Sequence, residues 1–137
     1  MRQPLPVSYN GRICCLTIGA TMPFVDARIA LTLTDEQKEA IKADFGQAVS
    51  TFGKGEGYLM VGITDGYDLW LGGRKLDKGA YVSFSMIGDT PDAGCREFSA
   101  KVCDILQRHA GISSDSVYIT FHPMAAARWG WNGSTFG

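Results

Sequence analysis

The apolar positions of this chain change period along its length, and each period predicts a type of element. Over about residues 35–52 they recur every three or four residues, which is the spacing of a helix with one buried face. Thr34 and Gln37 have the spacing of a capping box at its start, and Gly53 supplies a stop signal at its end. A second helix is predicted between residues 90 and 111, with a proline in its first turn and a glycine after its last.

Between and around the helices, apolar residues that are β-branched or aromatic predict strands. The predicted pieces are strands at residues 24–31, 58–64, 80–87 and 117–121, a short extended piece at 67–71, a polar connection at 72–79 and an irregular or short helical turn at 123–127. Strand 58–64 is largely apolar, so it is predicted to be buried on both faces. Residues 128–137 close the chain without a predicted element.

The order of these elements is two β-α-β units in succession. It predicts an α+β fold in which two β-α-β repeats form a four-stranded sheet with two helices on one face. Two helices cannot cover both faces of such a sheet. The other face must therefore be covered by partner subunits or stay wet, and the apolar strands favour covering.

Composition and charge exclude several classes of function. The chain has 137 residues, of which 45% are hydrophobic, and its formal net charge is −1. It therefore lacks the surplus of basic side chains with which a general nucleic-acid binder neutralises phosphates. No apolar run approaches the roughly 20 residues that cross a bilayer, so no membrane span is predicted.

The side chains that most often carry catalysis form no familiar pattern here: there is no Ser-His-Asp site, zinc signature or P-loop. Cys95 and Cys103 lie about 12 Å apart along the predicted helix, too far for a disulfide. Since no C-x-x-C pair exists, the thiols are predicted to be free and in a reducing compartment. His109 is interpreted as a partner of its helix dipole, and His122 as a structural residue at a strand end.

Residues 1–22 match nothing else in the chain, and we expect them to lie outside a domain formed by residues 23–137. They imitate a secretory signal poorly, because their apolar run is short. A start of translation at Met22 and removal of the segment by processing are the alternatives left open. The difference matters for Pro23, whose nitrogen is an amide in mid-chain and a basic secondary amine at a chain start.

Motifs along most of the chain agree with one known family. They are Met22-Pro23, Gly53-Lys54 with Tyr58, Leu71-Gly72, Ser85-Met86-Ile87-Gly88, the segment 115–121, Met124-Ala125-Ala126 and the segment 130–136. Together they resemble the macrophage migration inhibitory factor family of the tautomerase superfamily. The resemblance covers residues 23–137, with about one extra residue in the 72–80 connection.

This resemblance implies a cofactor-free keto–enol tautomerase, an isomerase that acts on small aromatic keto acids of the phenylpyruvate and dopachrome type. It implies a homotrimer with sites between subunits, no metal, and Pro23 as the catalytic base once it is the first residue. An amine beside Lys54 in an apolar pocket would be partly neutral at pH 7, because desolvation and like charge both disfavour the ammonium. The implied substrate-binding positions are Lys54 for the carboxylate, the backbone N–H of Ile87, Tyr118 of a neighbouring subunit, Thr120, and an apolar wall of Phe24, Tyr58, Trp131 and Phe136.

Three departures from the family pattern change what the resemblance implies. Thr120 stands where the family has a substrate-binding asparagine, so that hydrogen bond is expected to be shortened or lost. Trp129 replaces a smaller aliphatic residue at the pocket rim, which would narrow access and change substrate choice. Residues 80–83 offer no cysteine, so the thiol-oxidoreductase activity proposed for the family's C-x-x-C is expected to be missing.

Two other functions stay open at this point. One is a cytokine-like binding protein that acts on a host receptor. The other is a trimeric relative that is inactive because Pro23 is not N-terminal. The expected location is cytoplasmic, or outside the cell after release without a classical signal peptide.

Overall fold

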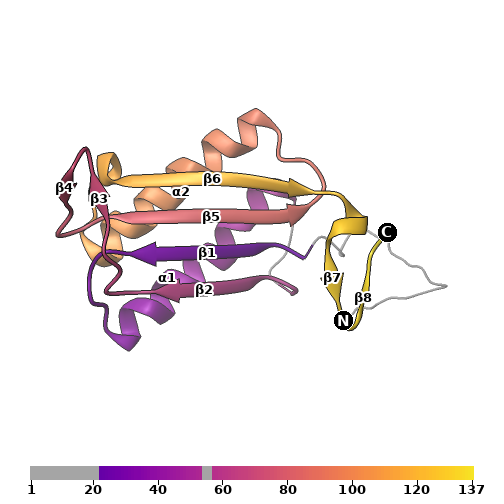
Figure 1. The fold of residues 1–137 in the computed structure, drawn as a ribbon, viewed down its shortest axis with the longest axis horizontal. Helices are drawn as coiled ribbons and strands as arrows, with labels where there is room; N and C mark the ends of the chain where they lie inside the picture. The colour runs from indigo at the N-terminus through magenta and orange to yellow at the C-terminus, as the bar shows by residue number, and fades with distance from the viewer. Residues whose placement is uncertain (1–21, 54–56) are drawn as a thin grey trace.

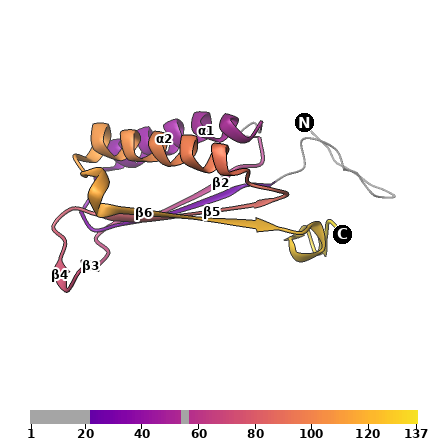
Figure 2. The same ribbon diagram turned by 90° about the horizontal axis from the view of Figure 1, so that it is seen from above.

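Two helices lie on one face of a four-stranded sheet in the computed structural model, which describes residues 22–53 and 57–137 (Figure 1, Figure 2). The elements in chain order are β1 (Phe24–Ile29), α1 (Asp35–Ala48), β2 (Met60–Thr64), β3 (Trp70–Leu71), β4 (Arg74–Lys75), β5 (Ala80–Ile87), α2 (Asp92–Ala110), β6 (Val117–Met124), β7 (Gly130–Trp131) and β8 (Ser134–Thr135). Short 3₁₀ helices cover Val49–Phe52, Ser114–Ser116 and Ala126–Arg128.

The sheet has the strand order β2-β1-β5-β6. β1 runs parallel to β2, and β5 runs parallel to β6, whereas the two central strands β1 and β5 are antiparallel. The chain therefore folds as two units, β1-α1-β2 and β5-α2-β6, joined through their first strands. This confirms the predicted α+β fold with two β-α-β repeats and both helices on one face.

The capping box at the start of α1 is present as predicted. The backbone N–H of Gln37 donates to the Thr34 hydroxyl at 3.1 Å, and the backbone N–H of Thr34 donates to the Gln37 side chain at 2.8 Å. The α-helix ends at Ala48, earlier than predicted, because residues 49–52 tighten into a 3₁₀ turn. Gly53 then stops it in the left-handed conformation, with φ of 71°.

Alternate residues of the central strands face the helices and form the core. In β1 and β5 every second side chain is buried, and the side chains between them are half-buried on the other face. The aromatic centre of this core is Phe84 of β5, whose ring centroid lies 4.7 Å from that of Phe98 and 5.2 Å from that of Phe52. Phe121 of β6 completes the cluster at 6.2 Å from Phe84, so both strands of the second unit are tied to α2.

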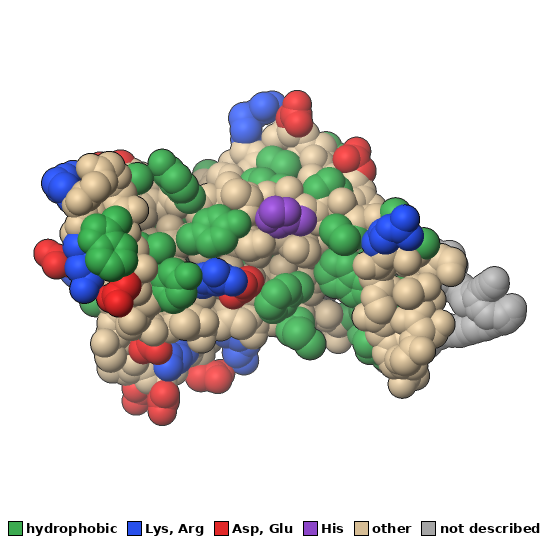
Figure 3. Space-filling view, in the orientation of Figure 1, with side chains coloured by type: hydrophobic (Ala, Val, Ile, Leu, Met, Phe, Trp, Pro, Cys, Tyr) green, Lys and Arg blue, Asp and Glu red, His purple; other side chains and the backbone are tan. Residues whose placement is uncertain are grey.

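The sheet face turned away from the helices is uncovered in the single chain, and we call it the open face. Figure 3 shows apolar side chains spread over much of it. Met60 is 67% exposed and Tyr118 is 64% exposed. The prediction that the strand containing Met60 is buried on both faces is therefore wrong for the single chain, because β2 is an edge strand with one face open.

Several strand ends differ from the predicted ones. β1 stops at Ile29, two residues earlier than predicted, although the N–H of Ala30 still donates to the carbonyl of Gly79 at 2.9 Å. β2 starts at Met60, later than predicted. β6 continues through Pro123, where an irregular turn was predicted. A proline is tolerated there because β6 is an edge strand, which can do without one N–H.

The structure also has two small hairpins that were not predicted from the sequence, β3–β4 and β7–β8. Each has a two-residue turn with two left-handed residues: Gly72 and Gly73 have φ of 60° and 83°, and Asn132 and Gly133 have φ of 53° and 81°. This backbone matches the twist of paired strands, and Asn-Gly and Gly-Gly are the sequences that favour it. The β3–β4 hairpin projects from one end of the sheet, away from the helices (Figure 2).

The cysteines agree with the predicted free thiols as far as the structure describes them. Cys95 and Cys103 are both unpaired with another cysteine and half-buried. Burial raises the pKa of the Cys103 thiol, which makes it a poor nucleophile. Cys14 and Cys15 lie outside the described residues.

Candidate active site

Pro23 lies at one end of the sheet, directly before β1, and is buried. Its carbonyl oxygen accepts a hydrogen bond from the backbone N–H of Met60 at 3.0 Å, so the start of β2 lies beside it. β5 ends at the same place because it runs antiparallel to β1, with Ser85 opposite Phe24 and Ile87 two residues further on. Two of the predicted site positions, Pro23 and Ile87, are therefore brought to one end of the sheet (Figure 1).

Three of the four residues predicted for the aromatic wall lie in contact with one another. The Trp131 ring stacks on Phe136 with centroids 6.0 Å apart and planes at 12°, and Tyr58 meets Trp131 edge-on at 6.0 Å. We call these three residues the aromatic cluster. Trp131 belongs to the β7–β8 hairpin, which lies beyond the end of the sheet where β1 begins (Figure 1). Because Tyr58 is two residues before Met60, the cluster is joined through β2 to the strand end that carries Pro23.

Phe24, the fourth predicted wall residue, lies half-buried on the open face. Its ring lies across β2 above Gly62: a methyl group added at Gly62 would stand 3.6 Å from the ring. That distance is an ordinary van der Waals contact, so the Phe24 ring covers position 62 without requiring a glycine there. Trp129, the predicted rim residue, is half-buried, and its carbonyl accepts from the backbone N–H of Phe136 at 3.3 Å.

Tyr118 lies at the opposite end of the sheet from Pro23. It pairs with Tyr81 of β5, which in turn pairs with Arg28 near the end of β1. Five residues at about 3.3 Å and two strand spacings of about 4.8 Å put Tyr118 about 19 Å from Pro23. Thr120 is about 14 Å away by the same count. One chain therefore does not bring either residue to Pro23.

Some predicted positions fall outside what the structure describes. Lys54, the predicted carboxylate partner, is one of them, and so are residues 1–21. Met22 is described, and only 6% of it is exposed.

The whole described part of the chain agrees with one family. The family model described as macrophage migration inhibitory factor matches residues 22–137. The chain belongs to the macrophage migration inhibitory factor family. The match begins one residue before Pro23 and takes in both β-α-β units and the two hairpins.

Relatives of known name agree with this membership. The macrophage migration inhibitory factor of Rattus norvegicus is 36% identical over 90 residues, which are 66% of this chain and 77% of that protein. A solved homologue from Prochlorococcus marinus is 27% identical, has a TM-score of 0.76 and covers 83% of this chain and 99% of its own. MIF2 of Leishmania major has a TM-score of 0.77 at 21% identity, covering 85% of this chain and 100% of its own, and so agrees in fold.

The resemblance found from the sequence is thereby confirmed at the level of the family and of the fold. The chain is a tautomerase-superfamily protein of the macrophage migration inhibitory factor type. Membership supports an isomerase of the tautomerase kind, or a cytokine-like role, in general terms.

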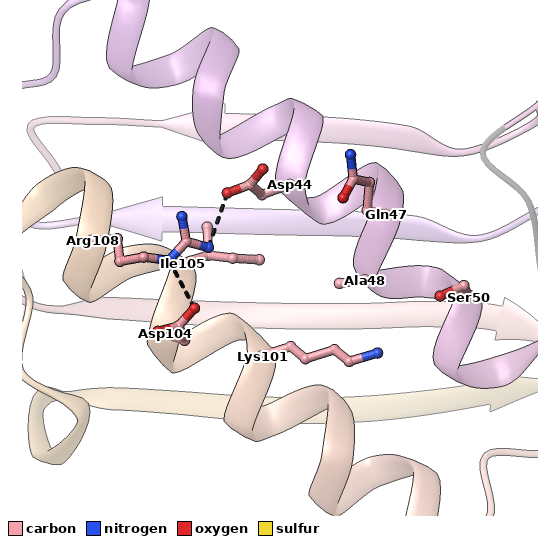
Figure 4. A pocket seen from close by; sticks show the side chains of 8 residues that line it. All are labelled: Asp44, Gln47, Ala48, Ser50, Lys101, Asp104, Ile105 and Arg108. Atoms are coloured by element: carbon pink, nitrogen blue, oxygen red, sulfur yellow. Dashed lines mark hydrogen bonds and ion pairs between the residues drawn. The ribbon is translucent and has the colours of Figure 1, made fainter.

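A separate hollow of about 580 Å³ lies between α1 and α2, on the other side of the sheet from the open face (Figure 4). Its side chains are largely polar, and its charges are paired. Arg108 donates to Asp44 at 3.0 Å and to Asp104 at 2.8 Å. The Nε2 of His109 lies 2.8 Å from the same Asp44 carboxylate. These contacts tie the helices together and leave no unpaired base for catalysis.

The hydrogen bond to His109, and then that from Arg108, hold the pKa of Asp44 below its ordinary value of 3.8, against the opposing effect of burial. The carboxylate is therefore ionised at neutral pH and serves as a permanent acceptor. His109 lies in the last turn of α2, the position predicted for a partner of the helix dipole. Its ring also forms a hydrogen bond with Asp44 of α1.

Two features are absent from residues 22–53 and 57–137. No group of three or more His, Cys, Asp or Glu is arranged to hold a metal ion. No helix there is both long and apolar enough to cross a membrane.

His122 was interpreted from the sequence as a structural residue at a strand end. The structure instead has it within β6, exposed on the open face. Its Nε2 lies 2.9 Å from the Thr120 hydroxyl, which lies 2.7 Å from the Tyr81 hydroxyl of β5. The two-residue spacing of Thr120 and His122 was a visible signal that they share a face, but the part played by Tyr81 depends on the register of two distant strands.

Proposed function

We propose that this chain, with Pro23 as its first residue, is a cofactor-free keto–enol tautomerase of small aromatic keto acids such as phenylpyruvate. One observation carries the proposal: Pro23 lies one residue inside the family match, at the sheet end that Ile87 reaches and to which β2 links the aromatic cluster. Family membership supports tautomerase chemistry in general, and Pro23 offers the base that this chemistry needs.

The chemistry follows from the amine. An α-amino group titrates near 7.7–8 in water. Apolar neighbours disfavour its ammonium form, so more of it is neutral at pH 7. The neutral nitrogen takes the proton from the carbon next to the keto group, and the electron pair moves onto the carbonyl oxygen. The ammonium then returns a proton to that oxygen, which yields the enol and regenerates the neutral amine.

The remaining roles are assigned on the family pattern. Lys54 pairs with the substrate carboxylate, and the backbone N–H of Ile87 donates to a substrate oxygen. The aromatic cluster and Phe24 receive the aromatic ring of the substrate, as expected for a largely apolar ligand site.

Tyr118 and Thr120 reach the site from a neighbouring copy of the chain. Their distance from Pro23 within one chain supports this, and so does the apolar open face, which a homotrimer would cover. In a cyclic trimer each site then combines Pro23 of one subunit with Tyr118 of the next.

Mixing two defective proteins tests the shared site. Pro23→Gly and Tyr118→Ala proteins, unfolded together and refolded at equal amounts, are expected to recover about a quarter of the wild-type rate. In a random cyclic trimer each site has one chance in two of an intact Pro23 and one chance in two of an intact Tyr118 beside it. A rate equal to the mean of the two parents would mean that both residues act within one chain.

The pH dependence tests Pro23 as a base. At saturating phenylpyruvate, where substrate affinity does not enter the rate, kcat of protein that begins at Pro23 is expected to rise with pH and level off, with a midpoint below about 7.7. Only the neutral amine can take a proton, so the rate follows its deprotonation. Protein with residue 22 still joined is the matched control, because its residue 23 nitrogen is an amide. The same rising profile from that control would contradict the proposal.

A further inference from the structure

Three polar groups form a continuous hydrogen-bonded chain on the open face. The Tyr81 hydroxyl lies 2.7 Å from the Thr120 hydroxyl, and the Thr120 hydroxyl lies 2.9 Å from Nε2 of His122. Tyr81 reaches Thr120 diagonally, because its direct partner in β6 is Tyr118. Thr120 therefore stands in the middle of the chain, with both neighbours within hydrogen-bond distance.

The number of protons in this chain decides what Thr120 can offer to a ligand. A hydroxyl has one proton and two lone pairs, and an imidazole nitrogen either donates or accepts. When Nε2 accepts, Tyr81 donates to Thr120 and Thr120 donates to His122, so both hydroxyl protons are used. When Nε2 carries a proton, His122 donates to Thr120, and one hydroxyl proton of the pair is released for a ligand oxygen.

The accepting state is the favoured one for a neutral imidazole. In this state the more acidic hydroxyl, the phenol of Tyr81, donates first, and the imidazole nitrogen, the best acceptor, receives the last hydrogen bond. Hydrogen bonds that point the same way along a chain polarise and strengthen one another. Protonation of His122 leaves it only donors and reverses the direction of the chain.

We propose that His122 is a positioning residue that controls whether Thr120 can donate a hydrogen bond to a keto-acid substrate. This inference deepens the proposed function and rests on it, since Thr120 acts in the tautomerase site of a neighbouring subunit. With the imidazole neutral, the Thr120 proton is donated to His122, so Thr120 offers a ligand only a lone pair and binds an anionic keto acid poorly. With the imidazolium present, a hydroxyl donor faces the substrate oxygen.

Few other charged groups face His122 among the described residues. Beside it on the open face β5 carries Ser85, then Ser83, so Tyr81 is the titratable neighbour on that strand. One strand further on, Asp26 and Arg28 of β1 pair with each other at 3.5 Å. α2 packs on the opposite face of β6, where the apolar side chains of that strand join the core.

The test measures the Kd of phenylpyruvate by calorimetry at pH 5 and pH 8, on either side of the range in which histidine titrates. The measurement uses the trimeric protein in a Pro23→Gly background, so that it does not depend on turnover. This parent protein, in which Thr120 and His122 are unchanged, is expected to bind phenylpyruvate about tenfold more tightly at pH 5 than at pH 8. Tenfold is the effect of one hydrogen bond to a charged ligand. The Kd ratio of each variant to this parent at the same pH removes any contribution of the terminal amine.

His122→Phe gives the deciding result. It removes the acceptor, so Thr120 keeps a free proton at both pH values, and binding at pH 8 is expected to improve about tenfold to the pH 5 level. If His122 acted through its positive charge alone, this variant would bind weakly at both pH values, and the proposal would be overturned. A loss of equal size at both pH values would likewise assign His122 a purely structural role.

Thr120 supplies the matched pair of controls. Thr120→Val has no hydroxyl and is expected to bind phenylpyruvate weakly at both pH values. Thr120→Ser keeps the hydroxyl and is expected to keep the tighter binding at pH 5. A pH effect that survives Thr120→Val, or no binding of phenylpyruvate at any pH, overturns the inference. Absence of turnover in protein that begins at Pro23, with the pH effect on binding intact, overturns the tautomerase proposal and leaves the role of His122 standing.

Discussion

Protein that begins at Pro23 is expected to lose about 100-fold or more in kcat/KM for phenylpyruvate when Pro23 is replaced by glycine. A positioned general base contributes about 10²–10⁴ to a rate. Glycine keeps an amine but loses the ring that holds the nitrogen lone pair in one direction. The backbone contact is kept, because the hydrogen bond from Met60 goes to the carbonyl oxygen of residue 23. Initial rates of tautomerisation measure the effect, and circular dichroism checks that the fold is unchanged.

Pro91→Gly is the control for this substitution. Pro91 is exposed, precedes α2 and lies on a different element from the proposed site. Its replacement is expected to leave the rate unchanged. Equal rates for Pro23→Gly and wild-type protein would remove Pro23 from the mechanism. A cytokine-like role, which family membership supports in general terms, needs no amine and is expected to survive Pro23→Gly.

Features that depend on neighbours along the chain could be predicted from the sequence. The capping box of Thr34 and Gln37 is local chemistry, and it forms as expected. The β7–β8 turn at Asn132-Gly133 is equally local, and Asn-Gly is a strong signal for a hairpin. It could have been predicted, although no element was predicted for residues 128–137. The 3₁₀ turn over residues 49–52 could not be predicted from the sequence. The apolar residues of the helix continue through it at the same spacing, so the pattern does not separate an α-helix from a 3₁₀ turn there.

Features that depend on strand register could not be predicted in the same way. Family resemblance named Tyr118 as a substrate contact, but only the antiparallel pairing of β1 with β5 puts it at the far end from Pro23. The register of β5 with β6 likewise joins Tyr81 to Thr120. Since shifting a strand by one residue would turn every side chain to the other face, the open face is a property of the assembled sheet.

The core prediction with the largest expected effect on stability concerns Phe84. Phe84→Ala is expected to lower the free energy of unfolding by about 3–5 kcal/mol, the usual cost of removing a fully buried aromatic ring. Its ring is wholly buried and contacts Phe52, Phe98 and Phe121, which come from three different elements. Urea unfolding at fixed protein concentration measures the change, because assembly would otherwise shift the apparent stability.

Phe84→Leu separates the lost volume from the lost ring contacts. Leucine fills most of the space, so the expected loss is below about 1.5 kcal/mol if packing volume dominates. A leucine variant as unstable as the alanine one would mean that the ring geometry itself holds the cluster together. An alanine variant within about 1 kcal/mol of wild type would contradict a core centred on Phe84. Ser83 and Ser85, the two neighbours of Phe84 in β5, lie on the opposite, open face of the sheet. The loss of stability is therefore expected to come from the core side of this strand.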